Sequence, residues 1–139
     1  MRNKILQVRT LPIDLEIVLL LLRVIAGIAM AMHGVGKIQS PFNWMGPDAA
    51  VPAFLQFLAA FAEFGGGIAL ALGLLTRIAS LGIAITMLVA FSLHAFILGD
   101  PFVNPKGGSY ELATLYLIIS LLFTFYGGGR FSIDGKIFK

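Results

Sequence analysis

Residues 51–75 read VPAFLQFLAAFAEFGGGIALALGLL, and this stretch decides how the chain folds. A helix needs about 20 predominantly apolar residues to cross a bilayer, and this run supplies them. Glu63 lies at its middle. A charge at the bilayer centre costs about 2.5–3.5 kcal/mol on insertion scales, so such a residue usually faces a partner or a cavity. The stretch therefore predicts a transmembrane helix with a polar inner face.

Three more apolar runs flank this one, and together they predict transmembrane helices at about residues 13–36, 51–75, 77–98 and 109–127. The connection at residues 73–77 is so short that the second and third helices must form an antiparallel hairpin. The chain is 58% hydrophobic and 12% charged, against roughly 25% charged in soluble domains. We expect an all-α membrane protein in which residues 1–139 form one four-helix transmembrane bundle.

The positive charges gather at one side of this bundle. Because four spans return the chain to its starting side, that side holds both termini and the short hairpin connection, whose charges are Arg2, Lys4, Arg9, Arg77, Arg130, Lys136 and Lys139. Only Lys37 and Lys106 lie in the connections of the other side. The positive-inside rule then places both termini in the cytoplasm, as expected of a multi-pass protein of the bacterial inner membrane. Basic residues at the chain ends do not predict nucleic-acid binding.

Two intramembrane charges need partners. Arg23 lies six residues into the first apolar run, about 9 Å from its end at 1.5 Å per residue. It could extend to the nearer interface, or it could pair with Glu63 of the next helix. We favour the pair, because buried charges seek partners and a guanidinium matches a carboxylate.

A polar layer is predicted in the outer leaflet, built by residues near the outer ends of three helices: His33, Lys37, His94, Tyr110 and Glu111. It is either an ordinary interfacial belt or a pocket that opens outward with Glu63 below it. Two histidines and a carboxylate suit non-haem iron, and two histidines suit haem, but no local ligand motif supports either. The sequence has no cysteine for thiolate ligands. We therefore expect no metal and no haem.

A quinone fits the pattern better. Such a ligand requires an apolar slot reached from the bilayer, with a few hydrogen-bonding or proton-exchanging groups. Aromatic side chains that could line the slot beside Glu63 are Phe61, Phe64, Phe91 and Phe96.

An ordered set of motifs resembles the DoxX family of small four-helix bacterial membrane proteins. The motifs are Leu22-Arg23, HGVGK at residues 33–37, EFGGG at 63–67, LGLLTR at 72–77, YEL at 110–112 and GGGRFSID at 127–134. The resemblance spans about residues 17–134. It implies a membrane subunit associated with quinone-linked oxidoreductases, with polar family positions at Arg23, His33, Lys37, Glu63, Arg77, Glu111 and Asp134. Arg77 and Asp134 would lie at the cytoplasmic face and could pair there.

Three functions remain open from the sequence. The first is a redox-associated subunit that binds a quinone or similar lipid-soluble carrier and serves an oxidoreductase partner. The second is a small proton-coupled transporter, for which four helices are few unless the protein forms a homo-oligomer. The third is a structural or assembly protein whose buried charges only specify packing.

Overall fold

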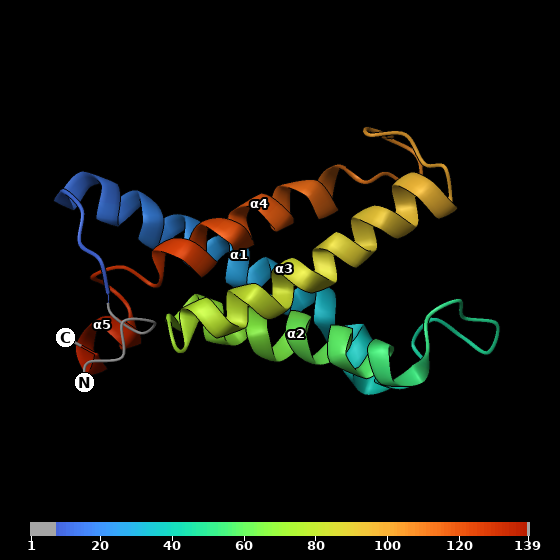
Figure 1. Ribbon diagram of the computed structural model, residues 1–139, viewed down its shortest axis with the longest axis horizontal. Coiled ribbons are helices and arrows are strands. Elements are labelled where there is room, and N and C mark those ends of the chain that lie inside the picture. The colour runs from blue at the N-terminus through green and yellow to red at the C-terminus, as the bar shows by residue number, and fades with distance from the viewer. Residues whose placement is uncertain (1–7, 139) are drawn as a thin grey trace.

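The computed structural model describes residues 8–138, so Arg2, Lys4 and Lys139 of the predicted basic side lie outside the described residues. Four long helices are formed: α1 (Ile13–Gln39), α2 (Ala53–Leu72), α3 (Thr76–Ser92) and α4 (Glu111–Tyr126). A π-helical segment, η1 (Leu93–Ile97), extends α3, and a short helix, α5 (Ile133–Ile137), follows α4 (Figure 1). The described residues contain no strand. The expected helices are therefore present, and η1 and α5 are additions that the sequence did not indicate.

The helix ends follow local chemistry. Pro52 is the N-cap of α2, because a proline fits the start of a helix but not its interior. Gly73 ends α2 in the left-handed conformation with φ of 71°, which only glycine adopts without a steric penalty. α1 continues to Gln39 rather than stopping near residue 36. This extra turn keeps Lys37 on the helix and fixes where its side chain can reach.

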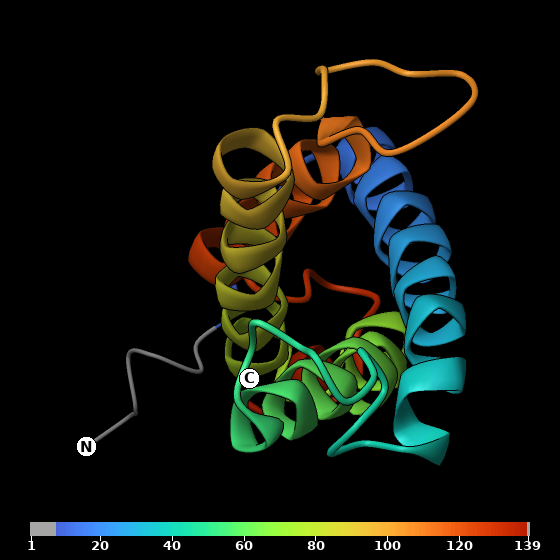
Figure 2. The ribbon, with the colours of Figure 1, turned by 90° about the vertical axis from the view of Figure 1, so that its right-hand side faces the viewer.

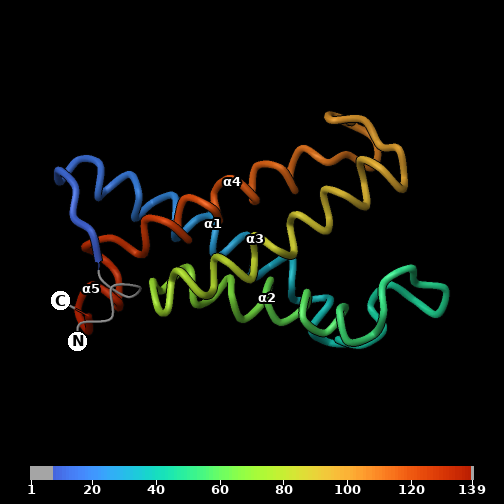
Figure 3. Tube along the Cα trace, viewed as in Figure 1, coloured from blue at the N-terminus to red at the C-terminus, as the bar shows by residue number. Residues whose placement is uncertain are grey.

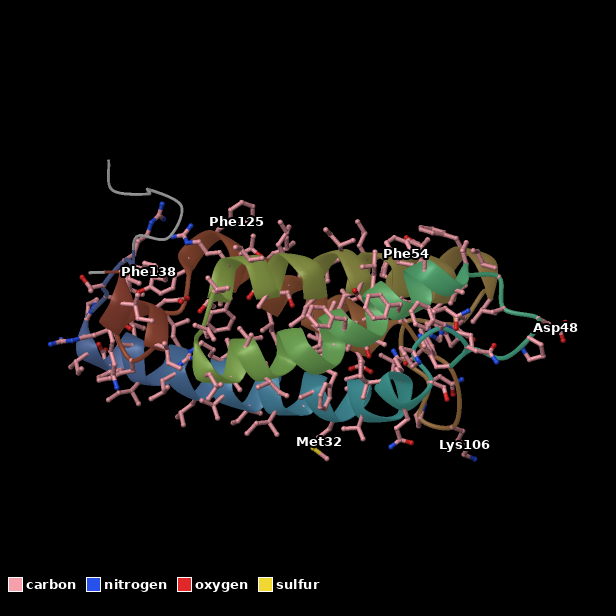
Figure 4. The ribbon with its side chains drawn as sticks, turned by 90° about the horizontal axis from the view of Figure 1, so that it is seen from below. Met32, Asp48, Phe54, Lys106, Phe125 and Phe138 are labelled. Atoms are coloured by element: carbon pink, nitrogen blue, oxygen red, sulfur yellow. The ribbon has the colours of Figure 1, made fainter. Side chains whose placement is uncertain are left out.

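The surface of the bundle is apolar and its interior carries charge. Met32, Phe54 and Phe125 project outward from the helices and are 70%, 65% and 69% exposed (Figure 4). Arg23 and Glu63, in contrast, are 1% and 2% exposed. α1, α2 and the combined segment Thr76–Ile97 are long and apolar enough to cross a membrane, whereas α4, with 16 residues, is shorter. This distribution is that of a membrane helix bundle.

The helices run alternately up and down. The connections at residues 40–52 and 98–110 lie at one end of the molecule, and the α2–α3 hairpin, the start of α1 and α5 lie at the other (Figure 3). Viewed from the end, α1, α2, α3 and α4 form a ring in chain order (Figure 2). We call the first end the loop end and the second the hairpin end.

The closest packing is between α1 and α2. A Cβ atom on Gly27 would lie 2.5 Å from Ala71 N, and one on Gly67 would lie 2.5 Å from Ala31 N. Small residues let membrane helices approach backbone to backbone. Since these contacts fix the antiparallel register, they place Lys37 near the level of Glu63 and Arg23 at the far end of α2.

Candidate functional site

An ion pair between a half-buried lysine and a buried glutamate joins α1 to α2 near the loop end. Lys37 Nζ lies 2.6 Å from Glu63 Oε1, and the carboxylate side chain is only 3% exposed. The ammonium group also lies 4.4 Å from the centre of the Trp44 ring, where the aromatic face attracts a cation. Among residues 8–138, the second oxygen, Glu63 Oε2, is buried without a hydrogen-bond partner. One half of the carboxylate therefore remains available for a further interaction.

Arg23 has a different set of partners, so the favoured Arg23–Glu63 pair is wrong. Its Nη1 donates to Leu70 O at 3.0 Å and Ala71 O at 2.9 Å, and its Nη2 donates to Phe131 O at 2.9 Å. The physical reason is the α1–α2 register, which places Arg23 beside the last carbonyls of α2. The guanidinium extends toward the hairpin end, as in the alternative in which Arg23 reaches the nearer interface. It is buried there rather than exposed.

The connection between α1 and α2 holds Trp44 over the ion pair. Trp44 Nε1 donates to Gln56 O at 2.9 Å. The Gln56 side chain accepts from Met45 N at 3.1 Å and donates to Val51 O at 2.8 Å. Gln56 thus ties the connection to α2.

Two cavities meet at the ion pair. The first, which we call the central chamber, has a volume of about 230 Å³ and is lined by residues of all four long helices. The second, which we call the lateral slot, has a volume of about 430 Å³ and lies between α2 and α3 under the 40–52 connection. Lys37, Glu63, Ala90 and His94 line both. The charged pair thus forms part of the wall between the two spaces.

The lateral slot borders the apolar outer surface of α2 and α3. Its aliphatic walls include Leu58, Ile85 and Val89, which are 43%, 57% and 53% exposed on the helix surface. Trp44 is its aromatic member. The predicted aromatic wall is wrong, because Phe61, Phe64, Phe91 and Phe96 are absent from the lining of this slot. Phe61 and Phe96 are instead exposed at 60% and 77%, where they face the surrounding lipid.

The predicted polar layer divides into two groups. His33 and His94 line the central chamber together with Lys37 and Glu63. The His33 ring meets the Tyr116 ring edge-on, with the centroids 5.9 Å apart. Tyr110 lies outside both linings and packs against Phe91 and Phe102, with ring centroids 5.3 and 5.2 Å apart. Glu111 begins α4 and also lies outside both linings.

His94 has an acidic partner that the sequence analysis missed. Its Nδ1 lies 2.6 Å from Asp100 Oδ2, and Asp100 N donates to His94 O at 2.9 Å. Six residues separate the two, and only the η1 turn brings them together. No group of three or more His, Asp or Glu side chains suited to a metal ion occurs within residues 8–138.

Comparison with known proteins identifies the family. The DoxX family model matches residues 18–96, more than half of the chain. The chain belongs to the DoxX family. The matched range includes Arg23, His33, Lys37, Glu63 and His94, and it ends before Tyr110, Glu111 and Asp134.

Two bacterial relatives align with most of this DoxX-family chain. An uncharacterized protein of Haemophilus influenzae is 35% identical over 120 residues, which cover 85% of this chain and 89% of the relative. A Bacillus subtilis protein named "Putative oxidoreductase CatD" is 32% identical over 127 residues, which cover 89% and 90%. No solved structure matches.

The hairpin end of this DoxX-family protein is closed by hydrogen bonds. Asp134 accepts from Leu75 N and Thr76 N, both at 2.8 Å, and from Thr76 Oγ1 at 2.7 Å, and therefore caps α3. Arg77 Nη2 donates to Tyr126 O at 3.1 Å. Asp134 and Arg77 share this end, as expected, but the bonds of Asp134 described here go to the start of α3.

Glu16 is a further buried acid that the sequence did not indicate. It is 2% exposed and accepts from Arg130 N at 2.8 Å and Tyr126 OH at 3.0 Å. Near the start of a helix it resembled an ordinary first-turn acid. Its burial depends on the segment after α4, which folds back beneath α1.

Proposed function

We propose that this DoxX-family protein is a redox-associated membrane subunit that binds a quinone or a similar lipid-soluble carrier in the lateral slot. The observation that carries the proposal is the position of the slot, which borders the apolar outer surface of α2 and α3 and reaches the Lys37–Glu63 pair. A carrier could enter sideways from the bilayer and place its tail against the aliphatic walls. Its polar ring would then lie against the charged groups.

The chemistry of the inner end suits a quinone ring. Binding pockets are mostly apolar with a few placed polar groups. The Lys37 ammonium can donate a hydrogen bond to a quinone carbonyl, and Glu63 Oε2 can accept one from a hydroquinone hydroxyl. The flat Trp44 ring provides a surface for stacking. Reduction of a quinone consumes two electrons and two protons, and an oxidoreductase partner would supply the electrons.

The family context is consistent with this proposal. The Bacillus subtilis relative carries the name of an oxidoreductase, and both relatives are bacterial. For this chain we propose the bacterial inner membrane, with both termini in the cytoplasm. The basic residues Arg9, Arg77, Arg130 and Lys136 belong to the segments of the hairpin end, which supports that orientation.

Trp44 provides the test, because it is the only tryptophan and lines the slot. The purified protein in lipid nanodiscs is titrated with decylubiquinone while the tryptophan fluorescence is recorded. We expect saturable quenching by decylubiquinone. For its reduced form, decylubiquinol, whose hydroxyl would donate to Glu63, we expect an affinity at least tenfold lower in Glu63→Gln than in the wild type. The matched control is Glu111→Gln, the same change at a position outside both cavities. Quenching that does not saturate, or equal affinities of Glu63→Gln and the wild type for decylubiquinol, would contradict the proposal.

A further inference from the structure

A histidine–aspartate pair lies where the central chamber approaches the loop end. His94 Nδ1 is 2.6 Å from Asp100 Oδ2, a short distance typical of a charge-assisted hydrogen bond. The side chains are 34% and 23% exposed, so the pair is accessible to water on its outer side. On its inner side, His94 lines both the central chamber and the lateral slot. The pair therefore spans from the proposed carrier site to solvent.

The backbone is shaped to form this pair. π-helical turns are rare and occur frequently at functional sites. Here η1 begins one residue before His94, and Leu98 N donates to Leu93 O at 2.9 Å to close the wide turn. Asp100 N then returns to His94 O at 2.9 Å. Two hydrogen bonds, one from the backbone and one between side chains, thus fix Asp100 against His94.

The connection at residues 98–110 also leaves space for the Asp100 carboxylate. A Cβ atom on Gly108 would lie 2.5 Å from Asp100 Oδ2, which is closer than real Cβ contacts come. Any other residue at this position would displace the carboxylate. Gly108 therefore permits the Asp100 position that the pair requires.

From this geometry we propose that His94 and Asp100 form a proton relay between the carrier site and the aqueous side at the loop end. The inference rests on the proposed function and adds the side on which protons enter or leave. An ionised carboxylate can only accept a hydrogen bond, so Nδ1 of His94 carries the proton and Nε2 is left as an acceptor. The side chains of titratable groups that surround the cavities with His94 are His33, Lys37, Glu63 and Tyr116.

The step moves one proton and no electron. A hydroquinone hydroxyl gives its proton to His94 Nε2, the O–H bond breaks, and a new N–H bond forms. The proton on Nδ1 passes to Asp100 Oδ2 and from there to water at the loop. The same path in reverse delivers a proton to a carrier that is being reduced by the partner enzyme.

The chain has only two histidines, so nitrogen NMR of ¹⁵N-histidine-labelled protein in nanodiscs reads the relay directly. His33→Gln assigns the two sets of signals. In the wild type we expect His94 to carry its proton on Nδ1, and we expect decylubiquinol to shift the Nε2 signal. Asp100→Asn should move the proton to Nε2, because an amide can donate to Nδ1. Asp48→Asn, the same change at an exposed position, should leave the spectrum unchanged.

The outcomes separate the relay from the carrier site. If decylubiquinone quenches Trp44 but decylubiquinol leaves the His94 signals unmoved, or if His94 carries its proton on Nε2 in the wild type, the relay is wrong and the carrier site stands. If Trp44 is not quenched, both proposals fail. Gly108→Ala provides a second variant, in which the carboxylate is kept but displaced. Gly108→Ala should weaken the NMR signal of His94 protonated on Nδ1, as Asp100→Asn does. An unchanged spectrum would contradict the relay.

Discussion

The two intramembrane charges of this protein have opposite environments. Arg23, at the hairpin end, donates three hydrogen bonds to main-chain carbonyls and is covered by the segment that follows α4. Glu63, toward the loop end, has one oxygen on Lys37 and the other without a partner in the described part of the chain, and it borders two cavities. A buried charge whose partners are all main-chain groups holds the fold together. A buried charge beside a cavity can serve a ligand.

The largest effect that this comparison predicts is on Arg23. Arg23→Leu leaves Ala71 O and Phe131 O without the Arg23 donor, whereas Leu70 O still accepts from Gly73 N. Each buried carbonyl left without a hydrogen bond costs about 1–3 kcal/mol. Chemical unfolding in detergent measures this loss of stability. Arg23→Lys keeps the charge but loses the planar guanidinium group. Its stability should lie between that of the wild type and that of Arg23→Leu. If Arg23→Leu is as stable as the wild type, Arg23 does not have the structural role that we assign to it.

The next effect is on the α3 cap. Asp134→Ala removes the hydrogen bonds to Leu75 N and Thr76 N, and loss of a helix cap costs about 1–2 kcal/mol. We expect a lower unfolding midpoint with unchanged affinity for decylubiquinone. Asp14→Ala, an exposed acid in the first turn of α1, is the control and should have little effect. A strong loss of quinone affinity in Asp134→Ala would contradict the view that the hairpin end is structural and the loop end binds the ligand.

Glu63→Gln should have the opposite signature. We expect stability to change by about 1 kcal/mol or less, because the Lys37 side chain is 27% exposed and the amide can still accept its hydrogen bond. Its effect should appear in ligand affinity instead. Unfolding curves and Trp44 titrations of one preparation measure both quantities. If Glu63→Gln unfolds under conditions where the wild type is stable, the Lys37–Glu63 pair is needed for folding, as Arg23 is, and the contrast between the two charges is lost.

The smallest effect is expected at Tyr110, which was predicted to contact the ligand. Its ring packs against Phe91 and Phe102 outside both cavities, and Tyr110→Phe keeps that ring. The affinity for decylubiquinone should stay within about twofold of the wild-type value, since no contact with the ligand is lost. Fluorescence titration of Trp44 checks this. A tenfold loss would place the ligand near the loop after α3 instead of in the lateral slot.

The sequence was sufficient for the helices, the α2–α3 hairpin and the burial of Glu63, because apolar runs and an isolated charge are local signals. The partner of Glu63 was not local. Both Arg23 and Lys37 lie on α1, and only the register set by Gly27 and Gly67 decides which of them reaches Glu63. The cap at Asp134 depends on a tail that folds back after α4.

The sequence does not predict the His94–Asp100 contact, and the reason is different. An ordinary helix would continue past His94 without bringing the two side chains together. The π-helical turn alters the path of the chain there, and apolar periodicity carries no clear signal for one such turn. A histidine near a helix end, followed by an acid beyond a Gly, is the pattern that could have drawn attention to it.

Photo-cross-linking with an azidoquinone tests whether the carrier binds in the lateral slot. The protein in nanodiscs is irradiated with the probe, and the labelled peptides are mapped by mass spectrometry. We expect labels in the lateral slot, at α2 residues 55–63 and at residues 85–98, and we expect excess decylubiquinone to remove them. Labels that gather instead on the apolar outer groove of α1 and α2, around Ile28, Met32 and Ile68, would contradict binding in the lateral slot.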